Sequence, residues 1–258
     1  MKPSSKTVSN RSKLLILAGL DPTGNAGLIR DMNVAKHLRV PHLGFPTAIT
    51  MQSDSKYVGT QFFEDTYFKK ISDQIQNEPI QAIKIGMLGN EETVRAIINL
   101  VAQTMRRSTP PSIIWDPVLH STSGGQLLTP EGLKLALQEL LPLTRLVTPN
   151  FEEIHQLLGI PPLHTNTPSD LLQIWHSRFH TPLYLKGGHT KSKSTDYYCD
   201  GEYMKVLKGK TTKRQLRGTG CTFSTAVAAH LLRGQSLRGA CISSKNLLQG
   251  LFEGHILN

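Results

Sequence analysis

No hydrophobic run in the sequence is long enough to cross a bilayer. A membrane-spanning helix needs about 20 consecutive apolar residues, whereas the apolar segment nearest the start, residues 14–18, is the length of a buried strand. Residues 1–12 are polar and basic, and they lack the apolar centre of a secretory signal. We therefore expect neither an integral membrane protein nor a secreted precursor.

Cysteine is scarce, with only Cys199, Cys221 and Cys241 in 258 residues. An odd number at wide spacing favours neither a disulfide framework nor a zinc site. A reducing, cytoplasmic environment is the natural prediction.

Aromatic residues make up only 6% of the chain, although the net charge is +10 and the pI about 9.6. Two interpretations of the charge stay open: a generally basic surface, or attraction of anionic substrates such as nucleotides. Basic residues concentrate at 205–217, but no aromatics interleave with them as a single-strand stacking platform requires. Without a zinc-finger or RNP-type pattern, we expect no nucleic-acid partner.

Two common nucleotide fingerprints are also missing. Gly209-Lys210-Thr211 resembles the end of a Walker A loop, but the pattern needs glycine where Met204 stands. A dinucleotide pattern that starts at Gly218 needs glycine where Phe223 stands. If the chain binds ATP, it uses a different loop.

Hydrophobic residues (38%) and charged residues (19%) are present in proportions typical of a globular domain. Short apolar runs alternate with amphipathic segments, which predicts βαβ units and an α/β fold with a mainly parallel sheet covered on both faces. We predict one domain over 13–258 after a disordered tail, 1–12. Asp200-Gly201, between the two β-prone runs of 196–206, adds a late antiparallel hairpin. The predicted strands are 14–19, 44–50, 82–87, 113–116, 146–148 and 183–186, and the predicted helices are 26–38, 64–76, 91–105, 130–141, 151–158, 169–179, 221–232 and 237–252.

The most informative segment is Gly218-Thr219-Gly220-Cys221, a glycine-rich turn that leads into a predicted helix. Free backbone N–H groups and the positive end of the helix dipole suit a phosphate or another oxyanion. Cys221 falls in the first turn, where the same dipole favours the thiolate. The segment predicts an anion site beside a candidate base, although a buried structural thiol stays open as the alternative.

Other polar segments follow predicted strands, at 19–27, 51–54, 116–118, 148–153 and 186–189. Each one alone is typical of turn chemistry. In open parallel sheets, however, ligands bind beyond the carboxyl ends of the strands. The shared location therefore predicts one site at that edge of the sheet.

Six motifs in these segments occur in a recognisable order. They are Ala18-Gly19-x-Asp21-Pro22-Thr23-Gly24-x-Ala26-Gly27, Lys84-Ile85-Gly86-Met87-Leu88, Asp116-Pro117-Val118, Thr148-Pro149-Asn150-x-x-Glu153, Lys186-Gly187-Gly188-His189 and Gly218-Thr219-Gly220-Cys221. Together they resemble the hydroxymethylpyrimidine/phosphomethylpyrimidine kinases of thiamine biosynthesis, in the ribokinase-like superfamily. The resemblance covers nearly the whole chain from about residue 13.

The resemblance implies a ribokinase-like three-layer α/β/α sandwich. It also implies transfer of phosphate from ATP, with Mg²⁺, to the hydroxymethyl group of 4-amino-5-hydroxymethyl-2-methylpyrimidine and then to the monophosphate. For the transferred phosphate, the resemblance implies an anion hole at Gly218, Thr219 and Gly220 and a catalytic base at Cys221. It implies ATP binding at Lys186, Gly187, Gly188 and Asn150, and Mg²⁺ at Asn150 and at Glu153, either directly or through water. For the pyrimidine it implies Gln52, Asp21, Gly19 and Ala26.

These roles agree with general chemistry. Backbone amides at a helix start can hold phosphoryl oxygens without reorganising, and a base must reach the attacking hydroxyl. The Gln52 amide can donate and accept, which suits the ring nitrogen and amine of an aminopyrimidine. Mg²⁺ prefers oxygen ligands and retains waters.

The chain departs from the family pattern at four places, one of which is Ile29-Arg30, in place of a pair that often contains glutamine. Asn25 replaces a common glycine, although asparagine tolerates left-handed backbone angles. The segment His120-Ser121-Thr122 lies where many relatives carry a lysine nearby. Arg217 stands where histidine or asparagine is frequent; its guanidinium would lie close to the phosphates, so we add it to the predicted ATP site.

Two other functions stay open. A pyridoxal kinase of the same superfamily also phosphorylates a hydroxymethyl group on a six-membered aromatic ring, whereas Gln52 and the Lys84 motif favour the pyrimidine. A non-catalytic vitamin-binding or regulatory protein is disfavoured by the intact set of Asn150, Glu153, Lys186 and 218–221. We expect no membrane partner, and a homodimer is left open.

Overall fold

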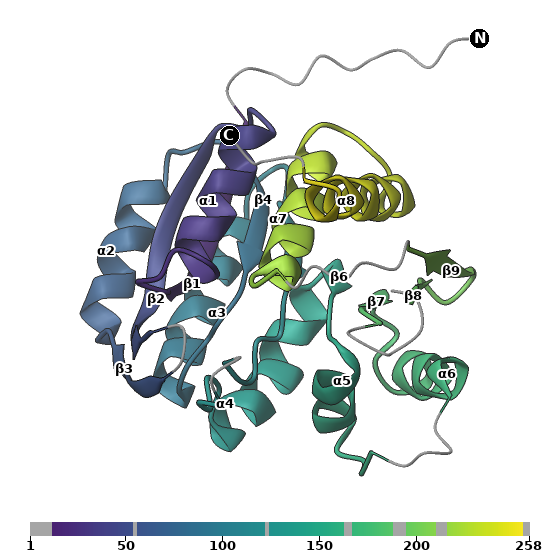
Figure 1. The fold of residues 1–258 in the computed structure, drawn as a ribbon. Helices are drawn as coiled ribbons and strands as arrows, with labels where there is room; N and C mark the ends of the chain where they lie inside the picture. The colour runs from purple at the N-terminus through teal and green to yellow at the C-terminus, as the bar shows by residue number, and fades with distance from the viewer. Residues whose placement is uncertain are drawn as a thin grey trace, which may run out of the picture.

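A mixed sheet runs through the centre of the computed structural model (Figure 1). The structure describes residues 12–53, 56–121, 124–162, 167–187, 195–209 and 216–254. The sheet order within them is β3-β2-β1-β4-β5-β6-β7-β8-β9. The strands are β1 (Lys13–Leu20), β2 (His42–Gln52), β3 (Tyr57–Phe62), β4 (Ile80–Ile85), β5 (Ser112–Trp115), β6 (Leu146–Val147), β7 (Leu183–Leu185), β8 (Thr195–Cys199) and β9 (Met204–Lys208).

The central strands, in the sheet order β2-β1-β4-β5-β6-β7, pair in parallel, as predicted. At one edge β8 and β9 are antiparallel, which confirms the late hairpin; Gly201 lies in its turn with φ of 95°. At the other edge β3 pairs antiparallel with β2. The sequence analysis does not predict β3, because residues 57–62 are mostly half exposed and are interrupted by Gly59 instead of forming an apolar run.

Helices cover both faces of the sheet, which completes the predicted three layers (Figure 1). Side chains alternate along a strand, so Leu15 and Leu17 of β1 enter one core while Leu14 and Ile16 enter the other. The first core contains α2 to α6, and the second contains α1, α7 and α8. The helices are α1 (Gly27–His37), α2 (Asp65–Ile75), α3 (Glu91–Met105), α4 (Pro130–Leu135), α5 (Phe151–Leu158), α6 (Pro168–Phe179), α7 (Thr219–Leu232) and α8 (Leu237–Phe252).

One predicted helix, 130–141, is only partly α-helical. After α4 the chain continues as a π-helical turn, η1 (Ala136–Leu140), and a 3₁₀ turn, η2 (Leu141–Leu143). Pro142 lies in η2 and has no backbone N–H to donate. The regular hydrogen-bond pattern therefore does not continue to the end of the predicted segment.

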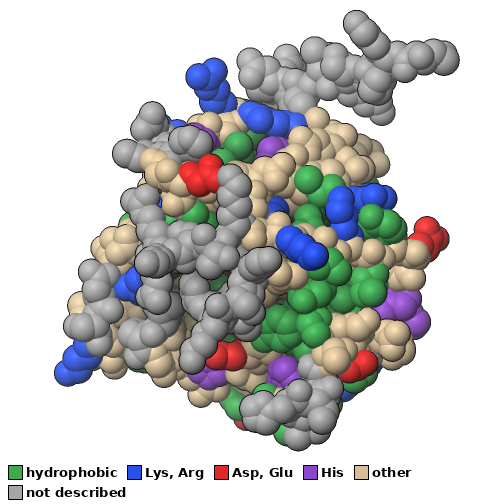
Figure 2. Space-filling view, turned by 45° about the vertical axis from the view of Figure 1, so that its right-hand side comes forward, with side chains coloured by type: hydrophobic (Ala, Val, Ile, Leu, Met, Phe, Trp, Pro, Cys, Tyr) green, Lys and Arg blue, Asp and Glu red, His purple; other side chains and the backbone are tan. Residues whose placement is uncertain are grey.

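The edge strand β9 leaves Met204 and Val206 about half exposed, at 50% and 46%. Figure 2 brings this side of the molecule forward and shows hydrophobic side chains gathered on the face. Lys205 and Lys208 lie on the same strand, and lysines on an edge strand oppose pairing with another sheet.

Several predictions fall outside the described residues, among them the role of Gly188 in ATP binding. Most of the predicted tail, 1–12, is also outside them, so the tail and the domain boundaries stay predictions. Among the helices that the structure does describe, none combines the length and apolar character needed to span a membrane.

The loop between β1 and α1 folds back onto the end of its own strand. Asp21 accepts hydrogen bonds from the backbone amide and hydroxyl of Thr23 at 3.0 and 2.9 Å. Gly24 and Gly27 take the left-handed conformation, with φ of 70° and 60°; Asn25 does not, because Arg39 and His180 are the only described non-glycine residues with positive φ. A Cβ on Gly27 would lie 2.2 Å from the Gly19 carbonyl oxygen, so only glycine allows this close approach.

Replacing Gly27 by alanine should therefore destabilise the fold more than replacing Gly24. Both substitutions force alanine into a left-handed conformation, at a cost of about 1–2 kcal/mol. Only Gly27→Ala adds a collision with backbone, because a Cβ on Gly24 meets nothing closer than 3.6 Å. Urea unfolding of both variants measures the difference; equal losses of unfolding free energy would show that the contact with Gly19 is unimportant.

Candidate active site

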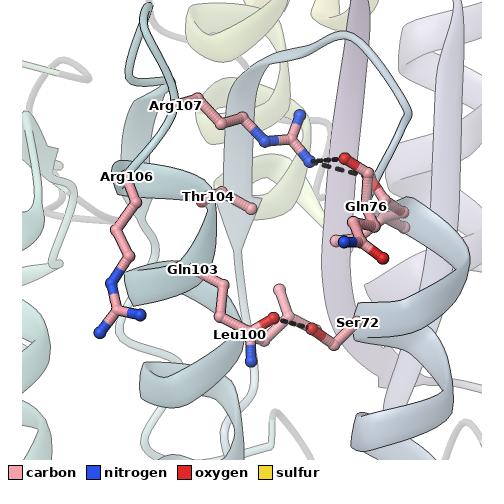
Figure 3. A pocket seen from close by; sticks show the side chains of 8 residues that line it. Ser72, Gln76, Leu100, Gln103, Thr104, Arg106 and Arg107 are labelled. Atoms are coloured by element: carbon pink, nitrogen blue, oxygen red, sulfur yellow. Dashed lines mark hydrogen bonds between the residues drawn. The ribbon is translucent and has the colours of Figure 1, made fainter.

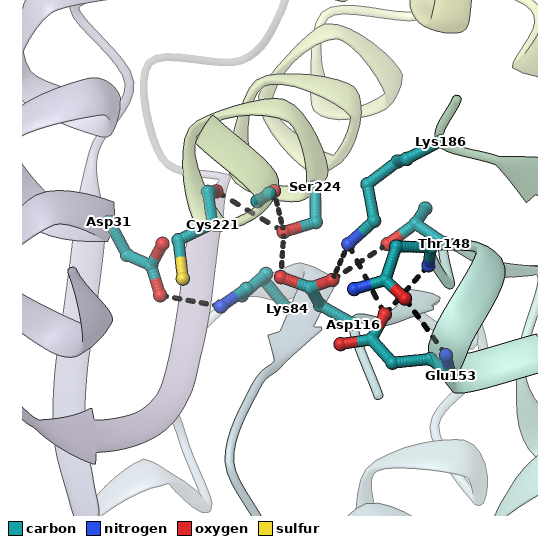
Figure 4. Close-up of polar contacts among 10 residues, drawn as sticks. Asp31, Lys84, Asp116, Thr148, Glu153, Lys186, Cys221 and Ser224 are labelled. Carbon is teal, nitrogen blue, oxygen red and sulfur yellow. Dashed lines mark hydrogen bonds and ion pairs between the residues drawn. The ribbon is translucent and has the colours of Figure 1, made fainter. Parts of the chain in front are cut away.

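Polar side chains that follow β5, β6 and β7 meet at the carboxyl edge of the sheet, as the sequence predicts (Figure 4). The Lys186 ammonium lies 2.7 Å from Asp116 Oδ1 and 3.7 Å from Glu153 Oε2. Asp116 is 1% exposed and Glu153 8%. Two carboxylates thus share one cation at a buried position.

Two hydroxyl groups hold the Asp116 carboxylate from other elements. Thr148, after β6, donates to Oδ1 at 3.2 Å, and Ser224 of α7 donates to Oδ2 at 3.2 Å. The segments of Asp116 and Thr148 belong to the site predicted from the sequence, but neither residue is assigned a role there and Ser224 is not recognised. The signal for Ser224 is weak, because a serine in the second turn of an apolar helix is also typical of a helix interior.

The charges of this cluster are strongly coupled. Burial alone would raise the pKa of Asp116, but Lys186 and Lys84 hold it below its usual value. Burial raises the pKa of Glu153 to about 7, against the opposing effect of Lys186. Burial alone would lower the pKa of Lys186, but Asp116 and Glu153 raise it, so the ammonium persists.

Asn150 and Glu153 begin α5 with a reciprocal capping box. The Glu153 amide donates to Asn150 Oδ1 at 2.8 Å, and the Asn150 amide donates to Glu153 Oε2 at 2.7 Å. An isolated bridge between Asn150 and Lys186 joins this helix start to the end of β7. The three predicted residues Asn150, Glu153 and Lys186 therefore lie together.

The glycine-rich turn places the start of α7 over this cluster. Gly218 caps the helix with φ of 73°, and a Cβ there would lie 2.2 Å from the Asn25 carbonyl oxygen. A Cβ on Gly220 would lie 2.9 Å from Lys186 Nζ. The amides of the first helical turn have no partner within the helix, so they and the Lys186 ammonium form one positive region.

Cys221 lies in the first turn of α7, next to a second buried ion pair (Figure 4). The backbone of Gly27, in the first loop, is among the groups that favour the thiolate of Cys221. Burial raises the pKa of Cys221 to about 12, and Lys84 opposes this rise. Desolvation of the thiol therefore opposes the thiolate that the helix start is predicted to favour.

The second ion pair joins Lys84 of β4 to Asp31 of α1. Their side chains are fully buried, and Lys84 Nζ lies 2.6 Å from Asp31 Oδ2. Burial raises the pKa of Asp31 to about 6 although Lys84 lowers it. Lys84 belongs to one of the six family motifs, but the sequence assigns it no role. Its position inside the apolar run 80–85 could have revealed the ion pair, because a buried charge requires a partner.

The predicted pyrimidine-binding residues lie along the first loop and β2. Ala26 is the N-cap of α1, and Gly19 lies against Met87, whose sulfur would be 2.6 Å from a Cβ on Gly19. Asp21 is buried, and both of its carboxylate oxygens accept hydrogen bonds from Thr23. Gln52 is the last residue of β2, at the same edge of the sheet, and is partly exposed.

A cavity of about 220 Å³ between α2 and α3 lies at the opposite edge of the sheet (Figure 3). Arg107 donates from this cavity wall to the carbonyl groups of Ile75, Gln76 and Glu78. Its guanidinium therefore caps the end of α2, and the cavity has no contact with the polar cluster.

Replacing Glu153 by glutamine should change how stability depends on pH. In the folded protein the Glu153 pKa is about 7, against a usual 4.5. Folding thus retains a proton that the unfolded chain loses, so the glutamate's contribution to stability is present below about pH 4.5 and lost as pH rises through 7. The unfolding free energy of Glu153→Gln relative to the original protein should rise over this window by roughly 3 kcal/mol. Glu92→Gln, at an exposed glutamate of α3, is the control and should leave the difference flat.

Comparison with known proteins agrees with this arrangement. A family model described as phosphomethylpyrimidine kinase matches residues 21–256. The hydroxymethylpyrimidine/phosphomethylpyrimidine kinase of Rhizobium meliloti (strain 1021) is 34% identical over 242 residues, which cover 91% of this chain and 88% of the relative.

Two solved structures share the fold. The phosphomethylpyrimidine kinase from Clostridium difficile 630 superposes with a TM-score of 0.77 at 25% identity, over 93% of this chain and 98% of its own. The pyridoxal kinase from Staphylococcus aureus in complex with AMP-PCP and pyridoxal gives 0.82 at 27% identity, over 96% and 90%. The predicted ribokinase-like fold is confirmed, and with the family model matching 21–256, the chain belongs to the phosphomethylpyrimidine kinase family.

Proposed function

We propose that this chain transfers the γ-phosphoryl group of ATP to the hydroxymethyl oxygen of 4-amino-5-hydroxymethyl-2-methylpyrimidine, and then phosphorylates the monophosphate, in thiamine biosynthesis or salvage. Family membership supports the kinase activity. The observation that carries the proposal is the first turn of α7, where unpaired helix amides, the Lys186 ammonium and the Cys221 thiol lie together.

Phosphoryl transfer depends mainly on positioning and charge stabilisation. The amides of Thr219, Gly220 and Cys221 point out of the helix start and would bind the oxygens of the transferring group. Lys186 would add a positive charge on the same side. Cys221 would accept the hydroxyl proton as the oxygen attacks phosphorus.

The ATP site would be built from Lys186, Gly187, Asn150 and Arg217, with Gly188 beyond the described residues. Complexes of the S. aureus pyridoxal kinase with ADP and with AMP-PCP support nucleotide binding at this fold. The Gly187 amide is held by Asp196 Oδ1 at 2.8 Å, which orients the backbone after β7.

The donor set at α5 fits Mg²⁺ bound through water. Asn150 Oδ1 and Glu153 Oε2 already accept capping hydrogen bonds, and Glu153 Oε1 has no hydrogen bond to a described residue. No group of three or more His, Cys, Asp or Glu residues in the described chain could enclose a metal ion. Oxygen-only, sparse ligation is typical of Mg²⁺ that binds with phosphates. When bound, Mg²⁺ would neutralise charge on the phosphates; Glu153 would hold it through water, beside Asn150.

The pyrimidine would occupy the space bounded by the first loop and the end of β2. Gln52 would read the ring edge, while Gly19 and Ala26 would form the wall. Because both carboxylate oxygens of Asp21 accept hydrogen bonds from Thr23, Asp21 would maintain the shape of the loop.

Pyridoxal is the competing acceptor, because the S. aureus pyridoxal kinase superposes with a TM-score of 0.82. The deciding assay incubates the purified protein with ATP and Mg²⁺ and either the pyrimidine or pyridoxal, and follows products by mass spectrometry. We expect the pyrimidine mono- and diphosphates to form with the higher kcat/KM. Preference for pyridoxal would reverse the assignment, and no phosphorylation of either ring would favour a non-catalytic protein.

Replacing Cys221 by alanine should slow the first phosphorylation by about 10²–10⁴-fold, the range for loss of a general base. The second phosphorylation should suffer less, because a phosphate monoester is largely ionised at neutral pH and needs no base. Separate rates with the alcohol and with the monophosphate test this. Cys199→Ala, at a partly exposed cysteine elsewhere, is the control; unchanged alcohol turnover in Cys221→Ala would exclude the thiol as base.

Two further proposals accompany this function. We place the protein in the cytoplasm, and we keep the homodimer as a hypothesis. Fractionation and analytical ultracentrifugation test them independently of the assay.

A further inference from the structure

The buried Lys84–Asp31 pair is not used by the phosphate-binding cluster, yet it lies beside the candidate base (Figure 4). Lys84 and Asp31 are both 0% exposed, and burying two charges is costly even when they are paired. A Cβ on Gly86 would lie 2.7 Å from Lys84 Nζ, so the ammonium lies over the end of its own strand. The pair is therefore directed at the carboxyl edge of the sheet.

The helix that carries Cys221 also binds this pair. Thr225 lies four residues after Cys221, on the same face of α7, and donates to Asp31 Oδ1 at 2.8 Å. The other oxygen, Oδ2, receives Lys84. Figure 4 shows the Cys221 sulfur beside both the carboxylate and the ammonium.

The charged groups around Cys221 come from four elements. Lys84 and Asp31 belong to β4 and α1, and Asp116 and Lys186 follow β5 and β7. Lys84 favours the thiolate of Cys221, and its effect is larger than the opposing effect of either Asp31 or Asp116. The backbone of Gly27 favours the thiolate as well, by less than any of these charges.

We propose that Lys84 is the positioning residue for the base: its ammonium stabilises the Cys221 thiolate, and Asp31 limits that effect by pairing with the same ammonium. The inference deepens the proposed function and rests on it for the role of Cys221. Lys84 keeps its own proton throughout and acts as a fixed charge.

The chemical step balances as follows. Cys221 is a thiol in the free protein, so it first releases its proton to solvent. The thiolate so formed takes the proton of the substrate hydroxymethyl group, so that the O–H bond breaks and an S–H bond forms. The freed oxygen electron pair forms a bond to the γ-phosphorus of ATP, and the bond from that phosphorus to its bridging oxygen breaks, releasing ADP and leaving Cys221 as a thiol again.

The test measures the thiol itself, without substrate. Iodoacetamide reacts with thiolates, and the tryptic peptide 218–233 contains Cys221 as its single cysteine, so mass spectrometry resolves its alkylation rate from those of Cys199 and Cys241. A tenfold change in thiolate population should change the rate about threefold, because nucleophilicity falls as the thiolate becomes easier to form.

The two charges should act in opposite directions. Lys84→Met should slow Cys221 alkylation at pH 8 about threefold or more, and Asp31→Asn should accelerate it by a similar factor. Damage to packing would move both rates the same way, so changes of the same sign, or no change in Asp31→Asn, would overturn the proposal. If Lys84→Met does not fold, a lack of acceleration in Asp31→Asn still overturns the proposal.

Lys245→Met is the matched control. Lys245 forms a comparably buried pair with Asp196, at 2.6 Å, but neither residue is among the charges that act on Cys221. The alkylation rate of Cys221 in Lys245→Met should match that in the original protein.

In turnover, Lys84→Met should lower kcat for the alcohol with little change in KM for ATP, whereas a rise in that KM alone would contradict a role at the base. If Cys221→Ala keeps full turnover while the alkylation rates still diverge, the base assignment fails and the electrostatic inference stands.

Discussion

One buried carboxylate, Asp116, is the interaction on which the geometry of the site depends. It follows β5 and binds Lys186 after β7, Thr148 after β6 and Ser224 on α7. Four segments that are distant in sequence are thereby held at fixed separations. Removing one partner of a buried ion pair is strongly destabilising, typically by 3–5 kcal/mol, so the arrangement cannot loosen at one point without exposing an uncompensated charge.

The same charges explain how a positive site can exist without excess repulsion. Lys186 and Lys84 are each paired with an aspartate, so neither ammonium loses its proton on burial. Around them the start of α7 adds amides that carry only partial charge. The site can therefore attract phosphates while the protein keeps Glu153, with a pKa near 7, at its border.

Much of the fold could be predicted from local pattern. Helices 91–105, 151–158 and 237–252 agree with α3, α5 and α8 to the residue, because amphipathic spacing and caps define them locally. Strand β3 could not be predicted, since it is defined by pairing with β2 and not by its own residues. The described residues of the predicted site lie at one edge of the sheet, but the partners of Asp116 and Lys84 were missed because each contact joins different elements.

The sequence by itself determined most of the strands and helices, the glycine turn before α7 and the family to which the chain belongs, because these follow from local spacing and from motifs in order. Only the tertiary structure decided the state of Cys221. The helix dipole, which is local, favours a thiolate, and Lys84 does the same from another element, but desolvation of the thiol and the charges of Asp31 and Asp116 raise its pKa. A pKa depends on everything that surrounds the group in space, and that environment exists only once the chain has folded.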